Sequence, residues 1–400
     1  MAHHEQRERL RAAVPEAAER AFVSGDPCYD RLRASLPMRH RYRRALGADD
    51  ERTVVALCTT WRPDSLLGSQ FGLYEQLLAE LDVDRYRVLA IIHPNVSAHH
   101  DPETVHRMLA PHVRSGLLLV APERGWRAAV AAADVLIGDH SSVTAYAAGA
   151  GVPVLFGHFP DHAVAPDSAV AALGARAPRL RRDQPLPPQL RKAMTSAAGQ
   201  HEAHRLITSC PDGAAERVRA RCYAMLGLDE PRGEPPVPAD PPTGLPTGRL
   251  RWRPSALYAT GELRPGPDLR VHRLRAEMLS PHQVPSGAHL LTTVTHPGRR
   301  LSAAADVLVL DDADDWGPHA EHWLRDALRT RRGLQLAAAV DDTSCTVRTR
   351  DGEQVRLTDP TGDSDPALFA SAAHRWLAAG FGLAELPDRI TVNGAHVAVS

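Results

Sequence analysis

Three short loops carry the residues that could bind an anionic group. One of them, Gly138-Asp139-His140-Ser141-Ser142, joins a buried apolar stretch to a segment with helical character. The first free N–H groups of a helix, its positive dipole end and two serine hydroxyls together favour a phosphate. We therefore predict that Ser141 and Ser142 bind a phosphate, and we take Asp139 and His140 as secondary candidates. The alternative is that Asp139 or Ser141 only caps the helix.

Two other loops could present a cation or a hydrogen-bond donor to the same anion. Thr59-Thr60-Trp61-Arg62 follows one predicted strand, and His93-Pro94 follows the next. Arg62 could form two hydrogen bonds with a diphosphate, Thr60 is a secondary candidate, and Trp61 is expected to pack against the protein. Because the proline favours extended backbone at His93, its imidazole could reach a phosphate or a leaving group. The alternative is a loop histidine without a ligand.

The elements that must position these loops alternate between strands and helices along the chain. Strand-length apolar runs, each followed by a helical pattern, are typical of a parallel sheet covered by helices. The predicted strands are 53–59, 86–92, 116–120, 135–137 and 152–156, and the predicted helices include 69–81, 104–109, 126–133 and 141–150. This order predicts an α/β fold with a doubly wound Rossmann-like sheet, in which ligands collect at the carboxyl ends of the strands.

A proline-rich segment divides the chain. Residues 229–254 alternate proline with glycine and acidic residues, a composition that favours extended backbone and predicts a linker. We predict a Rossmann-like domain over 1–228 and a small α+β domain over 255–400, to which we assign no chemistry. In the second domain, Asp351-Gly352 and Asn393-Gly394 are expected to turn two hairpins.

The overall composition excludes several classes of protein. With 47 basic and 48 acidic residues, the chain has no net field that would favour nucleic acid or an anionic membrane surface. The five cysteines lack CxxC spacing, so neither a disulfide framework nor a structural zinc site is predicted. No stretch approaches the roughly 20 apolar residues of a spanning helix, and the N-terminus lacks an apolar signal core. We therefore expect a cytoplasmic protein without a membrane span.

Clusters of acidic residues and histidines raise the question of a metal site. Residues 311–315 contain four aspartates that could chelate a hard cation, but we expect them to complement the dipole of the helix that follows. His158 and His162 have i, i+4 spacing, yet a proline between them interrupts the helical face. His319 and His322 are expected on a solvated helix face. We predict neither a metal nor a cofactor.

In their order and separations, these loops resemble the CDP-glycerol glycerophosphotransferase family, which builds teichoic-acid-type polymers of the cell envelope and has a GT-B fold. The resemblance covers roughly residues 10–165 and extends at most to 225. The residues that carry it are Ser24 to Leu32 (Gly-x-Pro-x-x-Asp-x-Leu), Arg39 to Gly47 (an arginine-rich helix), Thr59 to Arg62 (Thr-Trp-Arg), His93-Pro94, and Ala133 to Val143 (Asp-Tyr-Ser-Ser).

The resemblance implies the C-terminal, donor-binding half of a GT-B-type glycerophosphotransferase or glycosyltransferase. It implies a CDP-alcohol or nucleotide-sugar donor whose diphosphate faces His93, Ser141 and Ser142, with Arg62 nearby. Two departures from the family follow. Tyr146 stands where the family usually carries an acidic residue. The N-terminal domain that would bind the acceptor and supply a catalytic histidine has no counterpart in the sequence.

We therefore leave the catalytic residues unassigned. The expectation is that the chain is N-terminally truncated or that a partner domain or chain supplies the acceptor half. The alternative function is a non-catalytic nucleotide-binding or scaffold protein that retains the fold.

Overall fold

The computed structural model describes residues 1–48, 52–196, 205, 207–246 and 253–400. Its contacts divide the chain into two compact units. Unit 1 comprises Met1–Leu77, Tyr86–Leu109 and Leu117–Trp252, and unit 2 comprises Leu78–Arg85, Ala110–Gly116 and Arg253–Ser400. Within the described residues, no helix is long and apolar enough to cross a bilayer.

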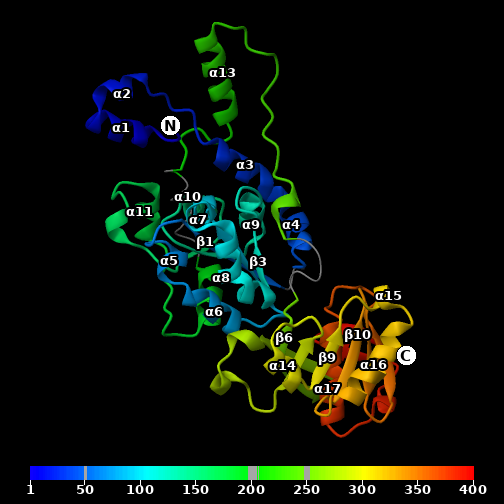
Figure 1. Ribbon diagram of the computed structural model, residues 1–400. Helices are drawn as coiled ribbons and strands as arrows, with labels where there is room; N and C mark the ends of the chain where they lie inside the picture. The colour runs from blue at the N-terminus through cyan, green and yellow to red at the C-terminus, as the bar shows by residue number, and fades with distance from the viewer. Residues whose placement is uncertain (49–51, 197–204, 206, 247–252) are drawn as a thin grey trace. The chain divides into compact units, whose positions relative to one another are not determined.

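Unit 1 is built on a five-stranded sheet with the order β3-β2-β1-β4-β5 (Figure 1). All neighbouring strands are parallel, as the alternation of strands and helices predicted. The strands are β1 (Thr53–Thr59), β2 (Tyr86–Ile92), β3 (Leu117–Leu119), β4 (Val135–Gly138) and β5 (Val154–Phe156). The chain runs outward from β1 through β2 to β3 and then returns to the other side of β1. The switch point, where such sheets bind ligands, therefore lies between β1 and β4.

The helices of the first 226 residues follow the predicted order. They are α1 (His4–Ala13), α2 (Pro15–Arg20), α3 (Pro27–Ser35), α4 (Arg39–Ala45), α5 (Leu66–Ser69), α6 (Gly72–Glu80), α7 (Pro94–His100), α8 (Pro102–Arg114), α9 (Trp126–Ala132), α10 (Ser142–Gly149), α11 (Ala169–Gly174), α12 (Leu186–Thr195) and α13 (Ala214–Leu226). Alternate residues of β1 point to opposite faces of the sheet, and both sets are buried, so helices or loops must cover both faces.

The arginine-rich helix α4 has a structural role. Arg39 and Arg43 bind the two carboxylate oxygens of Asp134 at 2.5 and 2.8 Å. Asp134 also accepts a hydrogen bond of 2.7 Å from the Val54 N–H at the start of β1. These contacts attach α4 to the amino end of the sheet, which is the end opposite the predicted ligand edge.

The proline-rich segment predicted as a linker is partly packed. Asp240 is 7% exposed and pairs with Arg31 at 2.5 Å and with Arg127 at 3.1 Å. Gly244 crosses Gly125 so closely that a Cβ on either residue would lie 2.5 Å from the backbone of the other, and Gly125 has a φ of +86°. Both ends of this contact belong to unit 1. Residues 247–252 of the segment lie outside the described residues.

Unit 2 contains a closed barrel of nine strands, ordered β10-β11-β12-β14-β13-β7-β6-β8-β9 (Figure 1). The strands are β6 (Ala256–Arg264), β7 (Asp268–Arg275), β8 (His289–Thr293), β9 (Val307–Leu310), β10 (Leu336–Val340), β11 (Ser344–Thr349), β12 (Gln354–Thr358), β13 (Arg389–Val392) and β14 (Ala395–Val399). The helices are α14 (Arg299–Ala304), α15 (Ala313–Trp316), α16 (His319–Thr330) and α17 (Ala367–Ala378). All nine strands contribute to one apolar cluster that also contains α17.

The two hairpins predicted in this half are present, since β11 pairs with β12 and β13 with β14 in antiparallel register. The closure of the sheet was not predicted. It depends on pairs between segments far apart in the sequence, such as β7 with β13.

Buried ion pairs hold unit 2 together beside its apolar core. Arg273 has no exposed surface and binds Asp84 at 2.5 Å and Asp365 at 2.8 Å. Arg253 binds Asp365 at 2.8 Å and Asp311 at 2.6 Å. A buried charge is costly unless it is paired, so each of these carboxylates matters for the fold. We expected Asp311 to complement the dipole of the helix that follows it. In the structure it instead forms an ion pair with Arg253.

Two histidine rings, one buried and one half-buried, lie against each other in unit 2. The rings of His289 and His374 are 4.0 Å apart between centroids, and the Nε2 of His289 lies 3.0 Å from the Ser371 hydroxyl. Burial lowers the pKa of His289 to about 3, with smaller contributions from His374 and Arg375. Burial also lowers the pKa of His374, against the opposing charge of Asp306. Both imidazoles are therefore neutral in the folded protein at neutral pH.

This pair should make unit 2 sensitive to acid. Unfolding exposes both rings to water, where a histidine has a pKa near 6.5, so the unfolded chain binds more protons between about pH 3 and pH 6.5. As the pH falls through this window, the free energy of unfolding should decrease by about 1.4 kcal/mol per pH unit for His289 alone. Urea unfolding at a series of pH values measures the slope. The double variant His289→Gln/His374→Gln should have a shallower slope, and an unchanged slope would contradict the assignment.

Candidate active site at the carboxyl edge of the sheet

A single buried carboxylate joins the loops that follow β1 and β4. Asp139 has no exposed surface. One of its oxygens accepts hydrogen bonds from the N–H of Thr60 at 2.8 Å and of Leu66 at 2.9 Å, and from the Thr59 hydroxyl at 3.3 Å. The other oxygen accepts from the N–H of Ser141 at 3.1 Å. Asp139 therefore fixes the loops on both sides of the switch point, and it does so by donors that are mostly backbone.

The loop after β2 joins the same arrangement through Thr59. The N–H of His93 donates to the Thr59 carbonyl at 3.3 Å. The Nδ1 of His93 accepts a hydrogen bond of 3.1 Å from the N–H of Asn95, so His93 is the N-cap of α7. A neutral imidazole that accepts at Nδ1 carries its proton at Nε2. Because His93 is exposed, this Nε2–H is available to donate to a phosphate oxygen.

Arg62 is exposed on the loop after β1. Its guanidinium carbon lies 4.9 Å from the centre of the Trp61 ring, and the Trp61 ring also meets His99 edge to face at 6.5 Å. The turn is tight, since a Cβ on Gly68 would lie 2.7 Å from the Pro63 carbonyl oxygen. Trp61 therefore packs against Arg62 of its own loop and against His99 of α7, and Arg62 is exposed.

The two serines of the loop after β4 have different environments. Ser141 is the N-cap of α10, and its hydroxyl accepts from the N–H of Thr144 at 3.3 Å. It also lies 2.9 Å from the Thr144 hydroxyl and 3.5 Å from the Cys58 thiol. Ser142 is the first residue of the helix and is exposed. Helix capping was the alternative role considered for Asp139 or Ser141. In the structure Ser141 caps α10, whereas Ser142 is exposed to solvent.

Two further side chains lie near these loops: Cys58, to which no role was assigned from the sequence, and His140, which is one of the secondary candidates. Burial, followed by the charge of Asp139, raises the pKa of the Cys58 thiol to about 12, which keeps it protonated and unreactive. His140 is half-buried, and its Nδ1 has no hydrogen-bond partner among the described residues. A buried ring nitrogen without a partner is uncommon, so His140 remains a candidate for a ligand contact.

Tyr146 of α10 packs in an aromatic cluster with residues of α3 and α9. Its hydroxyl donates to Asp26 at 2.6 Å, and its ring stacks on Tyr29 and on Trp126 at centroid distances of 5.9 and 5.8 Å. Burial raises the pKa of Tyr146, and its hydrogen bond to Asp26 raises it further. Asp26 also caps α3 by accepting from the N–H of Cys28. A carboxylate is therefore present beside α10 although it comes from a distant loop.

The loop after β5 contains the histidines weighed earlier for a metal site. His162 lies 3.7 Å from Asp64, and both side chains are exposed. Among the described residues, no group of three or more histidine, cysteine, aspartate or glutamate side chains is arranged to hold a metal ion.

The carboxyl edge therefore combines three exposed polar groups on loops that are fixed to one another. They are the guanidinium of Arg62, the Nε2–H of His93 and the first turn of α10 with the Ser142 hydroxyl. All three are donors, and one carries a permanent positive charge. Such a set is suited to binding an anion.

Replacing the central carboxylate should loosen this edge. The change Asp139→Asn puts an NH₂ group against backbone N–H donors, and leaving such buried groups unpaired should lower the free energy of unfolding by about 2 kcal/mol or more. Chemical denaturation measures the loss. The matched control is Asp64→Asn, because that carboxylate lies on the same loop with its side chain 56% exposed. Equal stability of the two variants would show that Asp139 does not hold the loops.

Comparisons with known proteins find similarity to one family model and to several solved structures. Residues 2–156 match the family model described as CDP-Glycerol:Poly(glycerophosphate) glycerophosphotransferase. No curated protein matches the chain. Among solved structures, a single-residue variant of the wall teichoic acid polymerase TagF is 19% identical, with a TM-score of 0.37 over 56% of this chain and 57% of that chain. The same variant soaked with CDPG is 17% identical, with a TM-score of 0.40 over 57% of each chain.

This chain thus spans about half the length of those TagF chains. The sequence resemblance is confirmed by the family match over residues 2–156. The matched segment, residues 2–156, contains the whole parallel sheet, so the similarity to the CDP-glycerol glycerophosphotransferase family lies in this part of the chain.

Proposed function

We propose that unit 1 binds the diphosphate of a nucleotide donor, either a CDP-alcohol or a nucleotide sugar, at the carboxyl edge of its sheet. The observation that carries this proposal is the junction at the switch point. Asp139 and Thr59 fix three loops of a family-matched segment to one another, and Arg62, His93 and Ser142 stay exposed on them. Thr60 and His140 border the same junction and are secondary candidates, while Asp139 positions the loops.

Each exposed group has a separate task in this proposal. Arg62 would bind two diphosphate oxygens with its planar guanidinium. His93 would donate through Nε2 to an oxygen that gains negative charge as the donor is cleaved. The first N–H groups of α10 and the Ser142 hydroxyl would bind a second oxygen. These groups stabilise charge on the leaving group, which is the part of a transfer reaction that a donor-binding half supplies.

Transfer to an acceptor hydroxyl also needs a base, and we assign none in this chain. We propose that the chain is the donor-binding half of a GT-B-type transferase, most simply a glycerophosphotransferase. The acceptor half would come from a partner domain or a partner chain, in the cytoplasm. A second candidate is a nucleotide-binding or scaffold protein without activity. Tyr146 supports this second candidate. It stands where the family usually carries an acidic residue, and its hydroxyl is hydrogen-bonded to Asp26.

The donor site can be tested by removing its groups one at a time. His93→Asn keeps an oxygen that can cap α7 but removes the Nε2–H, and Arg62→Gln removes the charge. Each change should weaken the binding of CDP-glycerol, a UDP-sugar or CDP about tenfold, which is about 1.4 kcal/mol. Calorimetric titration of the full chain measures the affinity for each of the three compounds. The donor that binds wild type most tightly identifies the base and the transferred group.

The matched control is Arg20→Gln, which removes an exposed arginine from α2 in the same unit. It should leave the affinity unchanged. Binding that is equally weak in all three variants would indicate a nonspecific charge effect, and no binding by wild type would refute the donor site. If the nucleotide binds but no transfer occurs with any acceptor or partner, the scaffold function would be supported.

A further inference from the structure

Unit 2 has a cavity that the proposed function does not use. Its volume is about 480 Å³, and it lies beside α15 and α16. The residues that line it are two tryptophans, two histidines and two aspartates: Asp315, Trp316, His319, His322, Trp323 and Asp326. Tryptophan is the largest apolar side chain and is seldom left on a surface without a reason, so a pair of them in one cavity points to a ligand.

The helical repeat explains why these side chains share one face. His319, His322, Trp323 and Asp326 have the spacing i, i+3, i+4 and i+7, which places them along one side of α16. The other side of the helix carries its buried residues Leu324, Ala327 and Leu328, which pack on β9 and β10. α16 is therefore held against the barrel by one side and presents aromatic and acidic groups on the other.

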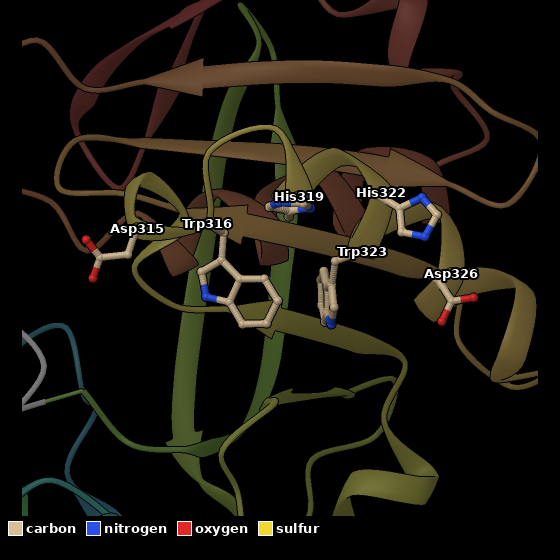
Figure 2. A pocket seen from close by; sticks show the side chains of 6 residues that line it. All are labelled: Asp315, Trp316, His319, His322, Trp323 and Asp326. Carbon is tan, nitrogen blue, oxygen red and sulfur yellow. The ribbon is translucent and has the colours of Figure 1, made fainter.

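Trp316 completes the cavity from the short helix α15. It is 43% exposed, whereas Trp323 is partly buried against the cluster beneath α16. Figure 2 shows the two indole rings projecting to the same side, with the ring of Trp323 seen edge-on and His319 above the space between them. Gly317 connects the two helices with a φ of +48°, a backbone conformation that other residues rarely adopt. This turn sets the position of Trp316 relative to α16.

The surroundings of the two rings are negatively charged. Residues 311–326 contain six carboxylates and one arginine. Asp311 is neutralised by Arg253, and Asp326 pairs with Arg329 at 2.6 Å in an exposed contact that is weak in water. In Figure 2, Asp315 and Asp326 lie on opposite sides of the tryptophan pair. The faces of indole rings are themselves electron-rich, so both the carboxylates and the rings favour a positively charged ligand.

We propose that this cavity, the Trp316–Trp323 site, binds a small organic ammonium ion of the choline type. A quaternary ammonium group combines a positive charge with apolar methyl groups and carries no N–H donor. Indole faces attract such a group through cation–π interaction at a small cost in desolvation. Nearby carboxylates add long-range attraction. An anion would be repelled by the same carboxylates. The site takes a dissolved ligand and is independent of the donor site in unit 1.

The experiment is an NMR titration of the full chain that follows its tryptophan indole N–H signals. The probes are tetramethylammonium, choline, methyl glucoside, and 3,3-dimethylbutan-1-ol, which is the uncharged carbon analogue of choline. We expect saturable shifts of the signals of Trp316 and Trp323 with both cations, and at least tenfold weaker binding of the neutral analogue. Trp316→Ala should weaken choline binding at least tenfold, and Asp315→Asn should weaken it less.

Phe381→Ala is the matched control, because Phe381 is a comparably exposed aromatic residue of the same unit, at 42%, and does not line the cavity. It should leave choline binding unchanged. Since Trp316 is exposed, its replacement should leave the protein folded, and circular dichroism checks this. Equal binding of the neutral analogue would reduce the site to an apolar groove. Shifts with methyl glucoside alone would make it a sugar site, and no shift with any cation would refute the proposal.

Discussion

Burying the carboxylate of Asp139 costs free energy that only its hydrogen bonds can offset. Its acceptors are satisfied by the backbone of Thr60, Leu66 and Ser141 and by the Thr59 hydroxyl. These donors come from two loops that are distant in sequence, so the carboxylate can be satisfied only when both loops are in place. The candidate site thus inherits its rigidity from a residue that is itself inaccessible to a ligand. Such support is what holds binding groups ready before a ligand arrives.

Adjacent residues on these loops consequently have different roles: some stabilise the fold and others face solvent. Asp139 faces inward and Ser141 caps a helix, while Ser142, one residue further, faces solvent. His93 divides these tasks within one ring, since Nδ1 caps α7 and Nε2 remains available. A short stretch of chain can therefore stabilise the fold and offer a ligand contact at once, provided that alternate groups point in opposite directions.

Much of unit 1 could be predicted because its signals are local. The five strands follow from apolar runs of strand length, and their loops follow from where those runs end. The role of Asp139 could not be predicted, because an aspartate before a helix has the same sequence pattern whether it caps the helix or binds another loop. The Asp26–Tyr146 contact was equally hidden, since it joins residues 120 positions apart. The packing of Asp240 was missed for a similar reason. The prolines of the segment around Asp240 favour extended backbone, but a segment with extended backbone can still pack against the rest of the protein.

Unit 2 is discontinuous in sequence. Arg273 binds Asp84, and Arg275 donates to the carbonyls of Leu78 and Ser115, all from segments that precede the proline-rich region by more than a hundred residues. Residues 253–400 excised at that region would keep two fully buried guanidinium groups and lose several of their acceptors. The proline-rich segment is therefore not a point at which unit 2 could be separated as an independent domain. Gene fusions or recombination that join a new partner there would have to preserve these earlier segments, so the two halves of this protein are expected to be inherited together.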